Sequence, residues 1–513
     1  MTGGYHSARD HQGPLELDAD VVVVGSGAGG SVVATELALT GQRVVVLEEG
    51  PKVSPADYAR MRPSESMRHI WRDGGMTMAL GIGDTPSINV TMGRCVGGSS
   101  VLTGAVCFRI PDEILREWSD DYGLAGYTPK EMEPFADHVE RNIHVEEVPP
   151  DMRSRGTQLF AEGAAKRGVE LKPLRRNTKG CQGCGRCNFG CPHEAKMSVD
   201  QSYLPRAVEA GTSVWSHCRV ERIRVKGRRA VGVTGRVLNR PGGKPGDTLT
   251  VHAKRVVVAC GAWNAPLLLR RSGIGGHGHV GRHLTVHPAF RGLARFDEPV
   301  RGWQGALQSA YTDAFEKEGI TMVGLFVPVG VLGATMPGVG VEHTRAAAHI
   351  DQLAIFGGMI HDQGGGRVHR VPGRHDPLVT YRMAKEDRAA IPRVVRLLAE
   401  IFAAAGAKEI FLPVLGMRSV TPDDLARIDL ERIPGSRFEC SSQHPLGTCR
   451  MGTSPEQSVV DANGKCWEVD ELYVADGSVL PTSLGVNPQL SIMTVATRIA
   501  WHMRDRKLPD QAT

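Results

Sequence analysis

Four of the eleven cysteines in this chain lie within positions 181–191. The stretch reads CQGCGRCNFGCP, which gives the spacing C-x2-C-x2-C-x3-C-P of a bacterial ferredoxin loop. The other cysteines are scattered singly, so the pattern favours a local metal site over a disulfide framework. The predicted ligands of an iron–sulfur cluster are Cys181, Cys184, Cys187 and Cys191.

The type of metal centre stays open at this point. Only one such loop is present, whereas in two-cluster ferredoxins the fourth cysteine binds the other cluster. A [3Fe–4S] cluster would use three thiolates, and a [4Fe–4S] cluster would use all four or a remote ligand such as Cys218. The alternatives are structural zinc, which usually joins two separated ligand pairs, and a thiol-rich loop without metal.

A glycine-rich loop near the start of the chain has the residues to hold a dinucleotide. Residues 25–30 read GSGAGG and match G-x-G-x-x-G. The first glycine permits a tight turn, the second lets the backbone approach a pyrophosphate, and the third allows close packing of helix on strand. An acidic residue eighteen positions later can accept hydrogen bonds from ribose hydroxyls. The residues assigned on this basis are Gly25, Ser26, Gly27, Ala28, Gly29, Gly30 and Glu48.

The elements around this loop have the order that the motif needs. Residues 21–24 are a β-branched run bounded by glycine, which predicts a buried strand. Residues 31–40 carry apolar side chains at helical spacing, and Gly41 is a suitable C-cap. Residues 44–47 predict a second buried strand. A strand, glycine loop, helix, strand and acidic residue in this order are far more specific than the glycine motif alone.

Length and composition predict a globular protein of two intimately joined domains. The 513 residues are 41% hydrophobic, and the net charge of +5 is a small excess over many charges of both signs. Without a block of Lys and Arg, no nucleic-acid partner is expected. The polar residues 1–18 predict a loose tail without a signal sequence, and the short apolar runs predict no membrane span. We expect a cytoplasmic location, with export beside a signal-bearing partner left open.

A second glycine-rich stretch makes the pattern specific for one family. Residues 96–100 read VGGSS, and Arg109 follows. Together with the first loop and Glu48, this stretch resembles the glucose–methanol–choline (GMC) family of flavin-dependent alcohol oxidoreductases. The resemblance implies that the first loop binds the ADP part of FAD and that the second passes beside the isoalloxazine ring. The second set of residues is Gly97, Gly98, Ser99, Ser100 and Thr103, where Thr103 replaces the asparagine usual in the family.

The resemblance also bears on how the flavin is held and on the cysteine loop. No histidine occurs between Thr77 and Arg109, where some members attach the flavin covalently, so non-covalent FAD is expected. Sugar dehydrogenases of the family carry a related cysteine loop with a [3Fe–4S] cluster. Val220 matches a family valine whose backbone meets the adenine.

The C-terminal part resembles the family's catalytic motifs. Residues 442–452 read SQHPLGTCRMG, and His444 matches the catalytic histidine. Asn487 matches its active-site partner. Oxidation of an alcohol removes a hydroxyl proton, which a histidine can take near neutral pH, and a hydride, which FAD accepts. An asparagine amide can hold the developing alcoholate oxygen. Further FAD contacts implied here are Asp476, Gly477, Asn487, Pro488 and Gln489, whereas no chemistry is assigned to His283 or His287.

The predicted fold class is α/β, with a Rossmann-like FAD-binding domain joined to a substrate domain built on an antiparallel sheet. The FAD-binding domain is expected at 19–110, 195–290 and 438–506, with a hairpin at 240–247. The substrate domain is expected at 111–194 and 291–437, with the cysteine loop at 181–192 and an amphipathic helix at 385–405.

The predicted function is FAD-dependent oxidation of an alcohol or sugar by a dehydrogenase. Its electrons would leave through the cluster to an external acceptor such as a cytochrome or small subunit. The alternatives are an oxygen-using oxidase without a cluster, the flavin subunit of an electron-transfer complex, and a flavin-dependent lyase or isomerase.

Overall fold

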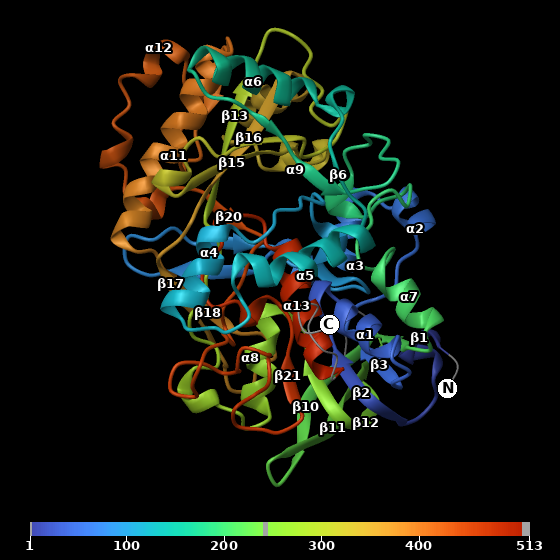
Figure 1. Ribbon diagram of the computed structural model, residues 1–513. Helices are drawn as coiled ribbons and strands as arrows, with labels where there is room; N and C mark the ends of the chain where they lie inside the picture. Colours follow the sequence, from blue (N-terminus) through green and yellow to red (C-terminus); the bar gives the residue numbers. More distant parts are fainter. Residues whose placement is uncertain (1–2, 240–244, 505–513) are drawn as a thin grey trace.

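Two large sheets organise the computed structural model, which describes residues 3–239 and 245–504 (Figure 1). In these residues the first sheet has the strand order β1-β9-β3-β2-β12-β11-β10, and β21 pairs with β12. The pairings from β1 to β12 and the pairing of β12 with β21 are parallel, whereas β12, β11 and β10 form antiparallel hairpins. The strands are β1 (Gly4–Ser7), β2 (Leu15–Val24), β3 (Val44–Leu47), β9 (Ser213–Ser216), β10 (Cys218–Lys226), β11 (Arg229–Leu238), β12 (Pro245–Val258) and β21 (Leu472–Val474).

The predicted strand–loop–helix–strand unit is confirmed in type and order. The strand predicted at 21–24 is the end of β2, and the strand predicted at 44–47 coincides with β3. The helix between them, α1 (Ala28–Ala38), begins three residues before the predicted start. It begins inside the glycine loop because the chain there packs directly on other backbone, where only glycine fits. Gly41 has the positive φ of 81° expected after a helix end.

The prediction of a loose tail at residues 1–18 is wrong for the described part of that segment. β1 adds an edge strand beside β9, and the 3-10 turn after it buries Ala8. Residues 15–18 alternate buried leucine with exposed acid and extend β2 backward. The period-two pattern of a half-buried strand was therefore present in these four residues.

The second sheet is mostly antiparallel and gathers strands from distant parts of the chain. In the described chain its order is β17-β18-β4-β5-β20-β13-β16-β15-β14-β7, with β19 paired to β13. The pairs β18–β4 and β20–β5 are parallel. Its strands are β4 (Met78–Gly81), β5 (Ile88–Val90), β7 (Lys172–Pro173), β13 (Ala289–Arg295), β14 (Ala310–Thr312), β15 (Ile320–Gly324), β16 (Leu353–Ile360), β17 (Gly365–His369), β18 (Leu378–Arg382), β19 (Glu409–Phe411) and β20 (Cys440–Ser442).

Helices cover both sheets. The C-terminal helix α13 (Gln489–Met503) packs against α1 and α5 (Pro129–Asn142), and α1 also contacts α7 (Tyr203–Glu209). Over the second sheet, α11 (Lys385–Ala404) packs against β13, β16 and α6 (Arg155–Lys166). The predicted apolar face of this helix is confirmed, because Ile391, Val394, Val395, Leu398 and Ile401 are all buried.

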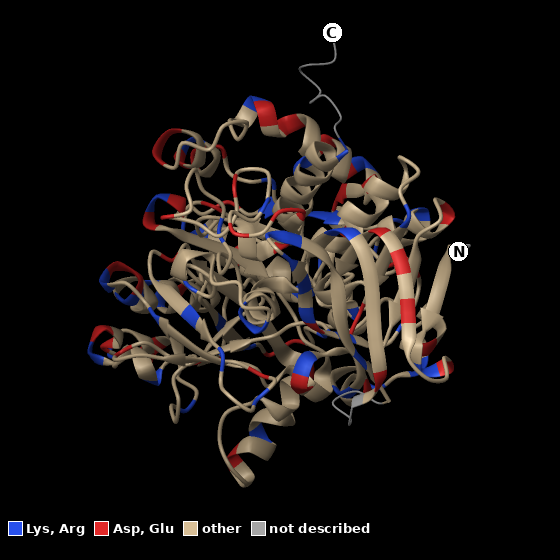
Figure 2. Cartoon of the chain, turned by 90° about the horizontal axis from the view of Figure 1, so that it is seen from below, with Lys and Arg blue, Asp and Glu red and all other residues tan. Residues whose placement is uncertain are grey.

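The remaining predictions about the whole chain concern its surface and ends. Lys and Arg positions are interspersed with Asp and Glu positions along the backbone drawn in Figure 2. No helix within residues 3–239 and 245–504 is long and apolar enough to cross a membrane. The hairpin predicted at 240–247 lies largely outside the described residues.

Candidate active site

One cavity of about 910 Å³ is lined by residues of both sheets. Residues of the glycine loop and Glu48 line one part of it, and strands β13, β15 and β16 line another. The segments that carry His444 and Asn487 also line it. The structure therefore brings the predicted nucleotide loop and the predicted catalytic pair, which are more than 400 positions apart in the sequence, to one cavity.

The glycine loop presents backbone to this cavity. Gly25 has a φ of 103°, and a Cβ there would lie 2.3 Å from the carbonyl oxygen of Ala259. At Gly29 a Cβ would lie 1.9 Å from the carbonyl oxygen of Ala475, so both positions require glycine. Within the predicted set, Gly25, Gly27, Ala28 and Gly29 line the cavity, whereas Ser26 and Gly30 lie behind it.

Glu48 lines the cavity with its carboxylate already engaged. Ser26 donates to it from Oγ at 2.7 Å and from its backbone N–H at 3.1 Å, and the N–H of Gly50 donates at 2.9 Å. Burial raises the pKa of Glu48 against the effect of these hydrogen bonds. A carboxylate has about four acceptor positions and three are used here, so about one remains for a ribose hydroxyl.

Two arginines beside Glu48 were missed by the sequence analysis. Arg72 and Arg219 line the cavity and both pair with Glu49, at 2.7 and 2.8 Å. Burial alone would raise the pKa of Glu49, but these two guanidinium groups hold it well below its usual range. Arg72 lies in a stretch that the sequence pattern leaves as irregular, so no periodicity marked it.

The second glycine-rich stretch forms a 3-10 turn, η3 (Gly98–Leu102), against the first loop. Gly97 lies behind the cavity and donates its N–H to Oγ of Ser26 at 3.1 Å. Thr103 donates from Oγ1 to Oε1 of Gln489 at 2.8 Å and so joins this stretch to the start of α13. The predicted residues of this stretch that line the cavity are Gly98, Ser99, Ser100 and Thr103.

The C-terminal segments close the same cavity. Asp476 accepts from the N–H groups of Ser478 and Gly261, each at 2.8 Å, and holds the start of α8 (Gly261–Arg271) beside it. Helix α13 begins at Gln489, and this end of the helix lines the cavity. The partial positive charge of a helix N-terminus favours a negatively charged ligand. The other predicted contacts that line the cavity are Val220, Gly477, Asn487 and Pro488.

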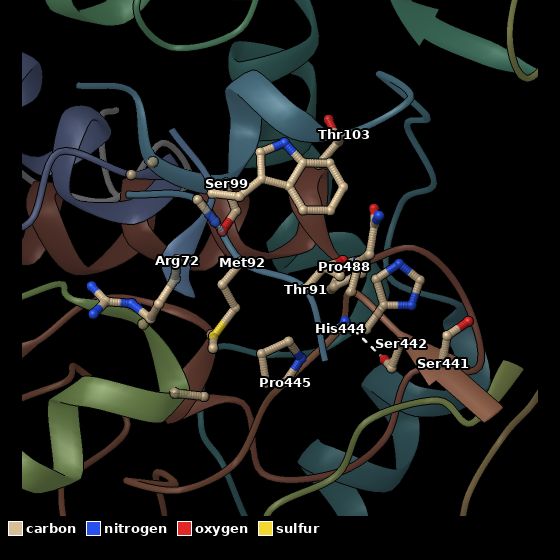
Figure 3. Close-up of a pocket in the computed structure, with 18 of the residues that line it drawn as sticks. Arg72, Thr91, Met92, Ser99, Thr103, Ser441, Ser442, His444, Pro445 and Pro488 are labelled. Carbon is tan, nitrogen blue, oxygen red and sulfur yellow. Dashed lines mark hydrogen bonds between the residues drawn. The ribbon is translucent and has the colours of Figure 1, made fainter. Parts of the chain in front are cut away.

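His444 and Asn487 are hydrogen-bonded to each other in the cavity, and Figure 3 shows His444 beside Ser442, to which its backbone is hydrogen-bonded. Nδ2 of Asn487 lies 3.1 Å from Nε2 of His444, and the backbone N–H of His444 donates to Oγ of Ser442 at 3.0 Å. Burial, with a smaller effect of His287, lowers the pKa of His444 well below 6.5. The imidazole is therefore neutral near pH 7 and has a lone pair at Nε2. Nδ1 of His444 and Oδ1 of Asn487 are buried without a hydrogen-bond partner in the described chain.

A buried histidine holds the segment that leads to Asn487. Nε2 of His287 accepts from the N–H groups of Leu484 and Gly485, at 2.9 and 3.2 Å. Its ring lies edge-on to His444, with centroids 5.2 Å apart, and burial lowers its pKa to about 3. No role was predicted for His287, because a lone His-Pro gives no signal for one.

The predicted metal site at the cysteine loop is not supported by the described residues. The four cysteines line a small cavity with Arg176 and Lys196, but no three His, Cys, Asp or Glu side chains in the described residues are placed to hold a metal ion. Cys184 is exposed, and Sγ of Cys187 instead accepts from Nη2 of Arg176 at 3.1 Å. The spacing of cysteines gives their order along the loop but not the directions of their side chains. The ligand set Cys181, Cys184, Cys187 and Cys191 is therefore not supported by the structure.

Comparisons with known proteins identify the family. Models of the GMC oxidoreductase family match residues 19–289 and 366–496, so the chain belongs to the GMC oxidoreductases. It is 38% identical to the GMC-type oxidoreductase Rv0492c of Mycobacterium tuberculosis, over 95% of this chain and 76% of that protein. It is 29% identical to the long-chain-alcohol oxidase FAO1 of Arabidopsis thaliana, over 96% of this chain and 68% of that protein.

A solved structure supports the fold. Pyridoxine 4-oxidase from Mesorbium loti superimposes with a TM-score of 0.71 at 20% identity, over 95% of this chain and all of that one. The predicted fold class, a Rossmann-like domain joined to a substrate domain, is thereby confirmed. As a GMC oxidoreductase, the chain is an FAD-dependent enzyme that acts on CH–OH groups.

The residues of the cavity fit FAD. Gly27 lines the cavity, and a Cβ there would meet only the Cα of Gly98, at 4.0 Å, so open backbone faces the place of a ligand; the N-terminus of α13 favours an anion. The unpartnered Nδ1 of His444 and Oδ1 of Asn487 mark a place where a ligand is needed to satisfy buried polar atoms.

Proposed function

We propose that this protein is an FAD-dependent alcohol dehydrogenase in which His444 removes the hydroxyl proton of the substrate. The observation that carries the proposal is the hydrogen bond between Nδ2 of Asn487 and Nε2 of His444, in the cavity that the glycine loop also lines. FAD held in this cavity would supply the acceptor for the hydride of the carbinol carbon.

The pair can hold both sides of a hydroxyl group. A substrate that enters between the two side chains donates its O–H to Nε2 of His444 and accepts from Nδ2 of Asn487. The neutral imidazole takes the proton, and the amide stabilises the charge that develops on the oxygen. Since the imidazole is already deprotonated near pH 7, no prior proton loss is required.

Non-covalent attachment of FAD is part of the proposal. It is supported by the lack of histidine between Thr77 and Arg109 in the sequence. Denaturation in acid should release all of the flavin into the supernatant, whereas flavin that stays with the precipitate would contradict this part.

An external electron acceptor completes the proposed reaction. The cysteine loop packs on the stretch beside the cavity: Nδ2 of Asn188 donates to the carbonyl of Leu102 at 2.7 Å, and Asn188 also lines the cavity. An iron–sulfur cluster there stays a prediction that the placement of the thiols does not support, and the proposed oxidation does not depend on it.

The test separates the dehydrogenase from its alternatives. The purified chain, loaded with FAD, is mixed with alcohols in the absence of oxygen, and then with an acceptor dye or with air. Fast dye reduction with little hydrogen peroxide supports the dehydrogenase, and fast peroxide formation supports an oxidase. A chain that turns over no alcohol with any dye would be a relay subunit. Iron and sulfide measured on the same sample decide the cluster.

The names of relatives leave the substrate open. FAO1 is named for long-chain alcohols, and a relative from Sinorhizobium medicae, 26% identical, is named an oxygen-dependent choline dehydrogenase. One name indicates an apolar substrate and the other a cation, so the lining of the cavity has to distinguish between them. The cytoplasmic location stays a prediction.

A further inference from the structure

The cavity changes in polarity along the second sheet, from β5 and β20 near the catalytic pair to β15. Polar side chains line it on β5 and β20, the two paired strands beside the catalytic histidine: Asn89 on β5, and Ser441 on β20 followed by Gln443. These residues lie close to His444 in the sequence or through strand pairing. Their polar groups can form hydrogen bonds with a hydroxyl group at that end of the cavity.

Apolar side chains line the cavity on β15 and on the segment that follows it. This part contains Val323, Leu325, Phe326, Val327 and Val331, the last of which lies in α9 (Val329–Ala334). Five apolar residues within nine positions offer no hydrogen-bond donor or acceptor from their side chains.

The ionised residues that line this side of the cavity are already paired. Nη2 of Arg291 lies 3.2 Å from Oε2 of Glu439, and Nη1 of Arg291 donates to Oγ1 of Thr335 at 3.0 Å. The side chains of Arg291 and Glu439 are 30% and 39% exposed, so the pair lies where solvent reaches the cavity. A charged or polyhydroxylated substrate would have to displace one of these partners to form a hydrogen bond or ion pair with Arg291 or Glu439.

The opening of the cavity is also apolar. Met78 and Leu415 line the cavity and are nevertheless 40% and 47% exposed, which places them at its entrance. Around Met78, alternate residues of the same strand region are exposed and apolar: Met76, Leu80 and Ile82, at 76%, 44% and 38%. An exposed apolar rim at the mouth of a cavity is typical of a binding surface for an apolar ligand.

We propose that the substrate is a primary or secondary alcohol whose carbinol carbon carries a long aliphatic chain or an apolar ring system. The hydroxyl lies at His444 and the apolar body lies against Leu325, Val327 and Val331. This proposal rests on the proposed oxidation at His444 and specifies its substrate class. A sugar fits poorly, because its hydroxyl groups would lie unpaired against the apolar side.

The first experiment measures anaerobic flavin reduction in the FAD-loaded chain by 1-alkanols of three to ten carbons and by glucose. Each buried methylene should raise the second-order rate constant about fourfold until the apolar part is filled. Glucose should reduce the flavin more slowly than 1-decanol by at least about 100-fold. Equal rates for glucose and 1-decanol, or no dependence on chain length, would overturn the substrate class while leaving the proposed oxidation intact.

A second probe separates binding from chemistry. The tertiary alcohol 2-methyl-2-nonanol has no hydrogen on its carbinol carbon and is not oxidised. It should shift the flavin absorption spectrum at lower concentrations than tert-butanol does. If it does so while no primary alcohol reduces the flavin, the proposed oxidation fails and the substrate class stands. If neither alcohol perturbs the flavin and no alkanol reduces it, the substrate class is overturned as well.

Variants locate the apolar part. Leu325→Gln should raise the KM for 1-decanol about tenfold and leave the KM for 1-propanol within twofold. Val331→Gln, in a partly exposed helix, is the second variant. It should give the same pattern if Leu325→Gln does not fold. Leu378→Gln is the control, since Leu378 is 44% exposed on β18 and does not line the cavity. Equal effects of a lining variant on both alcohols would contradict the placement.

Discussion

Asn487 contacts His444 through a 3.1 Å hydrogen bond between its Nδ2 and the imidazole Nε2, although 43 positions separate the two residues. The contact depends on two segments that meet at the cavity: β20 leads into His444, and the start of α13 follows Asn487. The amide donates to the same imidazole nitrogen to which a substrate hydroxyl would donate. A hydroxyl group that enters the site replaces this hydrogen bond and contacts both side chains, so the two partners are already in place before the substrate binds.

The acidity of His444 predicts the pH dependence of the reaction. Burial lowers its pKa well below 6.5, so the imidazole should stay deprotonated from pH 6.5 to 8. Protonation removes the lone pair at Nε2, so kcat/KM should fall only as the pH drops below 6.5. The measurement is the pH profile of anaerobic flavin reduction. An acidic limb centred above pH 7 would contradict a neutral, buried base.

The amide of Asn487 predicts a loss of rate without a loss of cofactor. Asn487→Ala removes one donor to the developing alcoholate and should lower kcat by about 100-fold. Asn487→Asp should be at least as slow, because a carboxylate repels that oxygen. Bound FAD per chain is measured on the same samples and should stay near that of the wild type. A variant with normal kcat would remove Asn487 from this role.

The closeness of the glycine loop to other backbone predicts a specific steric effect. Gly29→Ala places a Cβ where the carbonyl oxygen of Ala475 lies only 1.9 Å away, so it should lower stability by at least about 2 kcal/mol and weaken FAD binding. Gly275→Ala is the control, since a Cβ there meets no atom within 4 Å. Thermal unfolding and flavin content are measured for both. Normal FAD content in Gly29→Ala would contradict the close packing.

Lys196 links the cysteine loop to the stretch that lines the cavity, so its replacement should lower stability. It is buried, and its Nζ donates to the carbonyl groups of Cys187 at 2.7 Å and Thr103 at 3.1 Å. Lys196→Met should destabilise the protein by about 2–3 kcal/mol, because it leaves buried carbonyls unpaired. Lys130→Met, at an exposed residue of α5 with no ion pair in the described residues, should change stability by less than about 0.5 kcal/mol. Equal unfolding midpoints for the two variants would argue against the link.

Local sequence patterns were sufficient to predict the elements that depend only on residues close together in the chain. The strand at 44–47 and the apolar face of α11 follow from burial periods of a few residues, and the structure has both. The start of α1 did not follow, because it depends on a contact between Gly29 and Ala475, which lie far apart in the chain. Short-range propensity disfavours a helix in a glycine-rich stretch, and tertiary packing overrides it.

Interactions across long sequence distances account for the rest. The pairing of β5 with β20 joins residues some 350 positions apart, and no local pattern indicates it. Arg219 and Arg72 were missed for the same reason, since their shared partner Glu49 brings together three separate segments. The cluster at the cysteine loop stays a prediction, because its regular spacing is not matched by a group of three metal-binding side chains in the described residues.

Anaerobic flavin reduction in His444→Ala tests the central claim most directly. The variant is loaded with FAD, its flavin content is matched to that of the wild type, and both are mixed with an alcohol that reduces the wild type. If His444 takes the hydroxyl proton, flavin reduction in the variant should be slower by about 100-fold or more. Near-normal reduction by the variant would show that another group is the base.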